Sequence, residues 1–79
     1  MKAKVYVTLK PSVLDPQGKA IKHSVQLLGF DSVSDIRQGK YFELDLATKE
    51  AAQATKLASE VADRLLANPV IESYRIEVE

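Results

Sequence analysis

The sequence contains no cysteine, a single histidine and only three glycines in 79 residues. The lack of cysteine excludes disulfide bonds and thiolate metal sites, and a secreted domain this small would normally carry disulfides, so we expect a reducing, cytoplasmic environment. His23 has no nucleophile or carboxylate at a recognisable spacing, and alone it cannot assemble a metal site. The isolated glycines exclude a Gly-rich phosphate loop. The sequence therefore predicts no catalytic residue, metal site or cofactor site in this chain.

Net charge and long apolar runs are absent as well. Eleven basic residues balance eleven acidic ones, and no basic stripe of the kind that binds nucleic acid is visible. No apolar run approaches the roughly 18 residues needed to span a bilayer. The N-terminus alternates apolar and polar residues, unlike a signal peptide. Nucleic-acid and membrane partners are therefore not expected.

The composition is that of one small globular domain. Hydrophobic residues make up 46% and charged residues 28% of the chain. A chain this short buries a small core and often depends on strong packing or self-association. We expect a single domain of residues 1–79 that associates with a second copy.

A strand and a helix are predicted near the N-terminus. Val5, Val7 and Leu9 alternate with polar residues, the period of a half-buried strand, which ends at Pro11. The next helix is expected to begin at Asp15-Pro16, a capping residue followed by a proline at the first helical position, and to end at Gly29. Its apolar stripe consists of Ile21, Val25 and Leu28.

A hairpin is expected next. Residues 32–37 and 41–46 are strand-like and are separated by Gln38-Gly39-Lys40, a short polar gap with a glycine. The first run is the weaker one, because Val33 and Ile36 are three residues apart and a regular pleat cannot bury both. A bulge or a partly exposed edge is expected there.

A second helix and a last strand complete the pattern. Thr48 is expected to cap the helix, with Glu50 in its first turn, and Asn68-Pro69 to end it. Alanines dominate its apolar stripe, which allows close approach to a sheet. The final strand is predicted from the alternation of Val70, Tyr74, Ile76 and Val78.

These elements follow the order βαββαβ. We expect an α+β fold of ferredoxin-like topology, with two helices on one face of a four-stranded antiparallel sheet. The opposite face is expected to be polar with interleaved aromatic residues and to pair with a second copy. This face is predicted to carry Lys4, Tyr6, Thr8, Lys10, Tyr41, Glu43 and Asp45.

Domains of this topology include acylphosphatases, metal chaperones and amino-acid-sensing regulatory domains. The loop Pro11–Leu14 lacks the arginine of an acylphosphatase, and the chain lacks the cysteine pair of a copper chaperone. A regulatory domain remains open, because its pocket forms from backbone groups at a dimer interface.

Three segments together resemble a known family: Val5–Gly18, Ile36–Leu44 and Leu65–Tyr74. They are similar to the PurS subunit of phosphoribosylformylglycinamidine synthase, an enzyme of de novo purine (IMP) biosynthesis, and the resemblance covers essentially the whole chain. It implies a non-catalytic subunit of a glutamine amidotransferase ligase. It also implies a homodimer or higher homo-oligomer that bridges the synthetase subunit (PurL) and the glutaminase subunit (PurQ), so that ammonia passes between them. ATP and magnesium are implied in the synthetase subunit, not in this chain.

The resemblance carries over no catalytic residue. The candidate subunit interface consists of Arg37, Gly39, Lys40 and Glu43, where two cations and a carboxylate surround the expected hairpin turn. A solvated turn with exposed charge pairs is the plainer interpretation of the same residues. The main alternative function is a dimeric regulatory domain that binds a small amino acid or a nucleotide.

Overall fold

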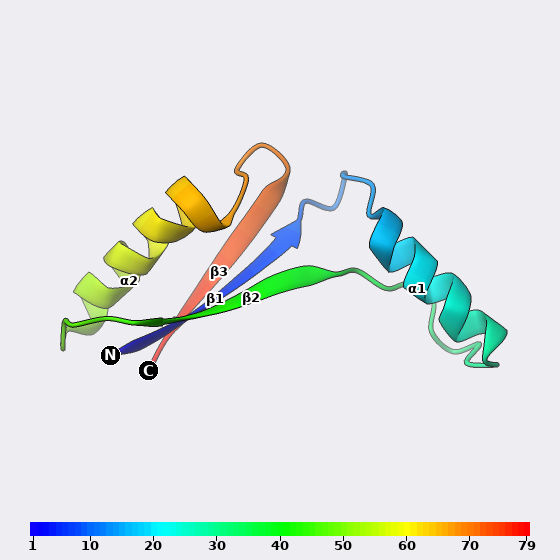
Figure 1. Ribbon diagram of the computed structural model, residues 1–79, viewed down its shortest axis with the longest axis horizontal. Helices are drawn as coiled ribbons and strands as arrows, with labels where there is room; N and C mark the ends of the chain where they lie inside the picture. The colour runs from blue at the N-terminus through cyan, green and yellow to red at the C-terminus, as the bar shows by residue number, and fades with distance from the viewer.

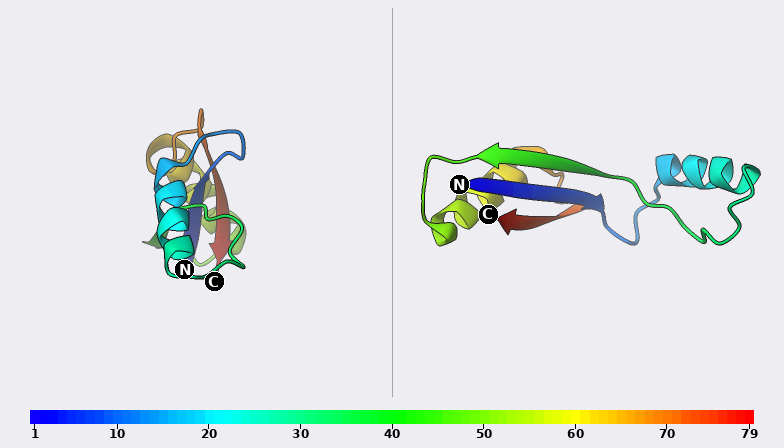
Figure 2. Two further views of the ribbon diagram at one scale, coloured as in Figure 1. Left: turned by 90° about the vertical axis from the view of Figure 1, so that its right-hand side faces the viewer. Right: turned by 90° about the horizontal axis from the view of Figure 1, so that it is seen from below.

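The computed structural model describes residues 1–79 and shows one antiparallel sheet with a helix on one face and a second helix away from it (Figure 1). β1 is the central strand, with β2 on one edge and β3 on the other. α2 packs against β1 and β3, and the two chain ends lie at the same end of the sheet (Figure 2). The elements are β1 (Lys2–Leu9), α1 (Pro16–Leu27), β2 (Gly39–Asp45), α2 (Ala51–Val61), the π-helical turn η1 (Ala62–Leu66) and β3 (Glu72–Val78).

The expected four-stranded sheet of ferredoxin-like topology is wrong. The sheet has three strands in the order β2-β1-β3, and the chain runs βαβαβ. Residues 32–37, expected as the first half of a hairpin, form no strand. Val33 and Ile36 are spaced three apart, so a pleated segment could not bury both. The segment instead returns the chain from α1 to β2, which begins at Gly39, inside the predicted turn.

The prediction that both helices cover one face of the sheet is also wrong. α1 lies beyond the ends of the strands, as the views agree (Figures 1 and 2). The Cα radius of gyration is 15.8 Å and the extents are 47 × 25 × 14 Å, whereas a compact chain of this length has a radius of about 12 Å. We call residues 10–38 the arm, and residues 10–15 with 35–38, where the arm joins the sheet, the elbow.

The predicted ends of α1 are confirmed. Asp15 is the N-cap residue, its carboxylate accepts from the Gly18 N–H, and Pro16 is the first helical residue. After the helix, Gly29 has a φ of +93°, a left-handed conformation that glycine adopts without steric cost.

The start of α2 lies later than predicted, whereas its end is confirmed. The N-cap residue is Glu50, not Thr48. The Thr48 hydroxyl accepts from the Glu50 N–H at 3.2 Å and so closes a turn that precedes the helix. η1 ends at Leu66, just before Asn68-Pro69. Neither helix is long and apolar enough to cross a membrane.

The core lies between α2 and the inner face of the sheet. Ala3, Val5 and Val7 of β1 are fully buried, as are three small residues of the helix and its last turn, Ala54, Ala58 and Ala62. The absence of larger side chains on this helix stripe lets its backbone approach the sheet closely. The predicted alternation of β2 and β3 is confirmed, although β3 begins at Glu72, two residues later than Val70. Their inward residues, such as Phe42, Leu44, Tyr74 and Ile76, are only partly buried.

Because α2 lies close to the sheet, the effect of a larger side chain on stability is expected to depend strongly on its position in this helix. Ala58→Leu inserts three carbons into a filled interface and is expected to cost about 1–3 kcal/mol, which lowers Tm by roughly 5–15 °C. Thermal unfolding followed by circular dichroism measures the change. Ala52→Leu, at an exposed position of the same helix, is the control and is expected to leave Tm nearly unchanged. Equal stability of both variants would contradict close packing of Ala58 against the sheet.

Candidate subunit interface

Arg37 lies at the elbow, where it joins the two chain segments that lead into and out of the arm. Its Nη2 donates to the carbonyl oxygens of Lys10 at 3.1 Å and Val13 at 3.2 Å. Both acceptors belong to the loop that follows β1. The guanidinium therefore already stabilises the elbow within one chain, in addition to any contact it makes with a partner.

Asp15 forms the second connection across the elbow. Its carboxylate is 4% exposed, and its two oxygens accept from the Gly18 N–H at 2.9 Å and the Gln38 N–H at 2.8 Å. These two hydrogen bonds hold the pKa of Asp15 below its ordinary value, and the bond from Gln38 has the larger effect. The carboxylate thus attaches the first turn of α1 to the residue that precedes β2.

Gly18 allows this attachment to be close. A Cβ atom at this position would lie 2.4 Å from the Ile36 carbonyl oxygen, so any other residue would force the helix and the returning segment apart. The arm is therefore held in one direction at its base.

Gly39 and Lys40 are the first two residues of β2 and lie in the sheet, not at the elbow. Gly39 is paired with Thr8, and a Cβ atom there would lie 2.5 Å from the Val7 carbonyl oxygen. Lys40 is paired with Val7. Its Nζ donates to the Leu66 carbonyl oxygen at 3.1 Å and pairs with Glu72 at 3.4 Å. Lys40 therefore connects β2 to the end of η1 and the start of β3.

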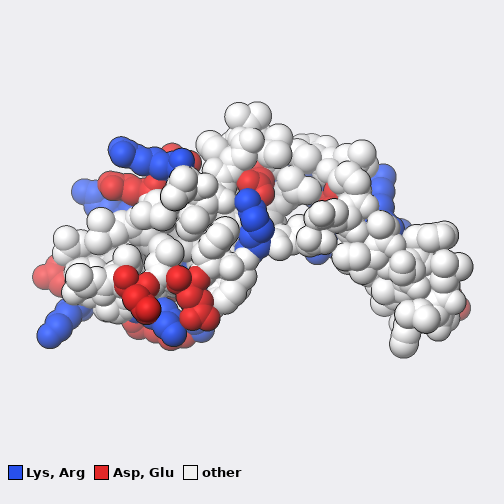
Figure 3. Space-filling view, in the orientation of Figure 1, with Lys and Arg blue, Asp and Glu red and all other residues white.

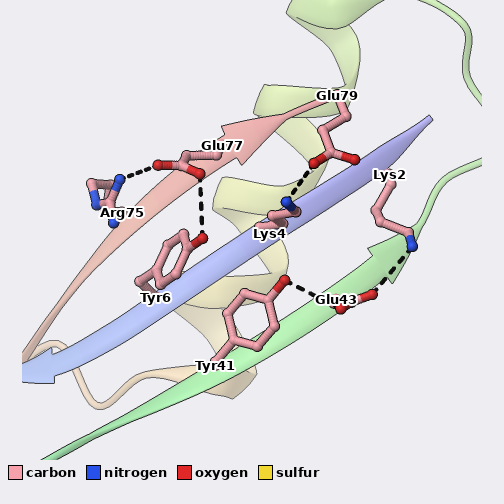
Figure 4. Close-up of polar contacts among 8 residues, drawn as sticks. All are labelled: Lys2, Lys4, Tyr6, Tyr41, Glu43, Arg75, Glu77 and Glu79. Carbon is pink, nitrogen blue, oxygen red and sulfur yellow. Dashed lines mark hydrogen bonds and ion pairs between the residues drawn. The ribbon is translucent and has the colours of Figure 1, made fainter.

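Glu43 lies on the face of the sheet opposite α2, which we call the open face (Figure 4). Its carboxylate pairs with Lys2 at 3.2 Å and accepts from the Tyr41 hydroxyl at 3.2 Å. The Lys2 ammonium lowers the pKa of Glu43, and Glu43 in turn raises the pKa of Lys2. The four candidate residues therefore lie in three separate places: the elbow, the start of β2 and the open face. Their role in a subunit interface stays a prediction.

An aromatic and cationic row crosses the open face. Tyr41, Tyr6 and Arg75 occupy matched positions of β2, β1 and β3. The two tyrosine ring centroids are 5.1 Å apart, and the guanidinium carbon of Arg75 lies 4.2 Å from the Tyr6 centroid. Tyrosine and arginine are enriched at the energetic centres of protein interfaces. Such a preorganised row suits contact with another protein.

Charge pairs surround this row. Lys4 pairs with Glu79, and Arg75 pairs with Glu77, which also accepts from the Tyr6 hydroxyl at 3.3 Å (Figure 4). The predicted polar, aromatic character of the face is confirmed. Lys10 was wrongly assigned to it, because Lys10 lies beyond the end of β1 and its Nζ donates to the Pro69 carbonyl oxygen at 2.8 Å.

The arm carries an apolar surface that the sequence did not reveal. Leu27 and Leu28 are each 75% exposed, Phe30 is 59% exposed, and Ile21 and Leu14 are also exposed. In Figure 3 the charged atoms gather over the sheet and α2, whereas the end of the arm at the right is almost uncharged on the face shown. The sequence feature that indicates this surface is the run Leu27-Leu28-Gly29-Phe30, which has more apolar residues than one stripe of a helix can bury.

The residues with catalytic potential do not converge. His23 is exposed on α1. No group of three or more His, Asp or Glu side chains is arranged to hold a metal ion. What the geometry provides is an arm that hydrogen bonds attach to the sheet at its base, with an apolar surface, and a sheet with a Tyr- and Arg-rich face.

A small α+β chain with these two surfaces is built as a subunit that acts through association. The family described as PurS, phosphoribosylformylglycinamidine (FGAM) synthase, matches residues 2–79. The chain belongs to this family, as the three sequence segments predicted.

Relatives over the full length support this membership. The chain is 50% identical to the phosphoribosylformylglycinamidine synthase subunit PurS of Bacillus subtilis, over 99% of this chain and 92% of that protein. The crystal structure of PurS from Methanocaldococcus jannaschii, one of the subunits of formylglycinamide ribonucleotide amidotransferase, matches with a TM-score of 0.89 at 35% identity, over 99% and 94% of the two chains. A chain in the PurLQS structure from Thermotoga maritima matches with a TM-score of 0.88 at 26% identity, over 96% and 93%.

The buried carboxylate of Asp15 predicts a specific loss of stability in acid. Because its pKa is lowered in the folded state, its contribution is present above the ordinary value of 3.8 and is lost as pH falls below it. Asp15→Asn places an amide N–H₂ against one of the two backbone donors and is expected to lower Tm at pH 7 by roughly 5 °C.

Thermal unfolding between pH 2 and pH 7 tests both statements about Asp15. The variant should lose less stability than the wild-type protein on acidification, since the titrating group is gone. Asp31→Asn, at an exposed loop position without a hydrogen bond to its side chain, serves as the control. A wild-type pH profile in the Asp15 variant would exclude this role for the carboxylate.

Proposed function

We propose that this chain is the small, non-catalytic subunit of phosphoribosylformylglycinamidine synthase in purine biosynthesis, and that it joins a synthetase subunit (PurL) to a glutaminase subunit (PurQ). The observation that carries the proposal is the match over nearly the whole chain to PurS subunits, including the one in the PurLQS structure. The chain is thus a PurS subunit, and its purpose is assembly.

Two separate surfaces on one chain allow self-association and contact with other subunits at the same time. The apolar arm lies beyond one end of the sheet, whereas the Tyr- and Arg-rich row lies on the sheet itself (Figures 1 and 4). The buried Asp15 carboxylate and the Arg37 guanidinium hold the arm in a set direction relative to the sheet. A bridge needs such rigidity, because partners that exchange ammonia must keep a constant orientation.

The remaining parts of the reaction are assigned to the partners. We propose that ATP and magnesium bind to the synthetase subunit and that glutamine is hydrolysed in the glutaminase subunit. A cytoplasmic location fits a small domain that has no disulfide bonds.

Reconstitution with and without this chain tests the bridging role. Glutamine-dependent formation of the amidine product is expected to fall at least about tenfold when the chain is left out, whereas activity with ammonium chloride should remain, because free ammonia needs no transfer between subunits. Equal losses with both nitrogen sources would show that the chain acts on synthetase chemistry instead. Joint elution of the three proteins by size-exclusion chromatography is the accompanying measurement.

Homo-oligomer formation follows from the uncovered apolar surfaces. α2 packs against β1 and β3, and the inward residues Phe42 and Leu44 of the neighbouring strand β2 stay partly exposed. The arm of the same chain lies elsewhere and exposes Leu27 and Leu28. We propose that a second copy supplies the missing cover, so that each arm packs against the other chain and the exchange closes a symmetric pair.

Leu28→Lys tests this association. Because the side chain is mostly exposed in the single chain, the substitution should leave the fold intact while it places a charge in the apolar contact between copies. Light scattering is expected to show a change from an oligomer to the monomer mass of 8.7 kDa. Gln26→Lys, at an exposed polar position in the last turn of α1, two residues before Leu28, is the control. A Leu28→Lys variant that keeps the wild-type mass and circular dichroism spectrum would place the contact elsewhere.

A further inference from the structure

The elbow contains a cavity of about 290 Å³ between the loop that follows β1, the first turns of α1 and the segment that returns to β2. In Figure 1 these segments lie where the arm leaves the sheet. Its volume is at the lower end of the roughly 300–1,000 Å³ typical of small-molecule sites. The cavity therefore suits a ligand of few atoms. Its wall includes Ser12, Val13, Leu14, Lys19, Asp35 and Arg37.

Opposite charges share this cavity without pairing. Lys19, Asp35 and Arg37 line it, but none of them takes part in any of the four ion pairs of the structure. On the open face and at the start of β3, by contrast, neighbouring Lys or Arg and Glu side chains do pair. The charges at the elbow are thus available to a ligand.

Backbone contacts explain why these charges stay apart. The Nη2 of Arg37 is occupied by two carbonyl oxygens of the loop, which leaves Nη1 and Nε without a partner. One oxygen of Asp35 accepts from the Ile36 N–H at 2.9 Å, and its other oxygen is free. Asp15, which also lines the cavity, has both oxygens occupied by backbone donors. The free donors of Arg37 and the free acceptor of Asp35 are therefore oriented by backbone contacts before any ligand arrives.

We propose that this cavity binds a free α-amino acid. The ligand carboxylate lies against Arg37 and Lys19, which offer charged donors. The ligand ammonium lies against the free oxygen of Asp35, and the ligand side chain lies over the apolar wall of Val13 and Leu14. A zwitterion is the ligand class that satisfies both charge signs at once, whereas a simple anion would leave Asp35 unpaired and repelled. This binding does not depend on the role of the chain in the synthase.

Ligand titrations with the full-length oligomer test the charge requirement. L-alanine and L-glutamine are the zwitterionic probes, and acetate and ethylamine carry one charge each. Calorimetry or amide chemical shifts should show saturable binding of both amino acids below about 20 mM, with the single-charge probes at least about tenfold weaker. No binding of either amino acid in this range would overturn the proposal. Acetate binding as tight as that of alanine would also overturn it, since it would identify a carboxylate site for an acidic group of a protein partner.

Two charge-neutralising variants locate the site. Asp35→Asn keeps an oxygen that can accept from the Ile36 N–H while it removes the charge, and Lys19→Gln removes one cation. Each is expected to weaken alanine binding about tenfold or more. The matched controls are Asp31→Asn and Lys22→Gln, which make the same changes on the arm but outside the cavity lining, and they should bind as the wild-type protein does. Unchanged binding in Asp35→Asn, with an unchanged circular dichroism spectrum, would refute the assignment of the ammonium partner.

Discussion

The direction of the arm depends on one buried carboxylate. Asp15 accepts one N–H from the first turn of α1 and another from the residue before β2. The same side chain satisfies the buried Gly18 N–H and the partly buried Gln38 N–H, and hydrogen bonds to a buried carboxylate are costly to disturb. Gly18 permits the contact because no Cβ intervenes. The shape of the molecule, and with it the position of every apolar residue on the arm, follows from this junction.

An arm held in this way leaves the single chain incomplete. The fully buried core is limited to small residues, with Val5 and Val7 as its largest members, while larger apolar side chains remain exposed on the arm. A short chain that buries so little gains stability by association. Assembly is therefore both the source of stability for this subunit and its proposed task in the synthase, and one rigid elbow serves both.

Local patterns were sufficient for most elements of the fold. The strand alternation around Val5, the Asp15-Pro16 helix start and the Asn68-Pro69 helix end were all predicted, because each depends on neighbouring residues only. The hairpin prediction failed because a glycine in a polar gap indicates a turn without saying whether the preceding segment pairs. Residues 32–37 had the weaker pattern, and the Gln38 N–H that directly follows them donates to the distant Asp15 carboxylate. The candidate residue Arg37 was noticed, but its contacts with Lys10 and Val13 were not foreseeable from sequence spacing.

The amino-acid sequence by itself determined the family, the absence of cysteine chemistry, the polarity of the open face and the positions of most helix and strand ends. Each of these is encoded in residue type or in short-range periodicity. Only the tertiary structure decided that α1 leaves the sheet, that the sheet has three strands and that the charges of Lys19, Asp35 and Arg37 surround one cavity without pairing. Those features arise from contacts between residues that are distant in the chain, for which an amphipathic stripe gives no direction. The apolar stripe of α1 predicts that this helix packs against another surface. The contacts at the elbow direct the helix away from the sheet of its own chain, so that surface is not this sheet.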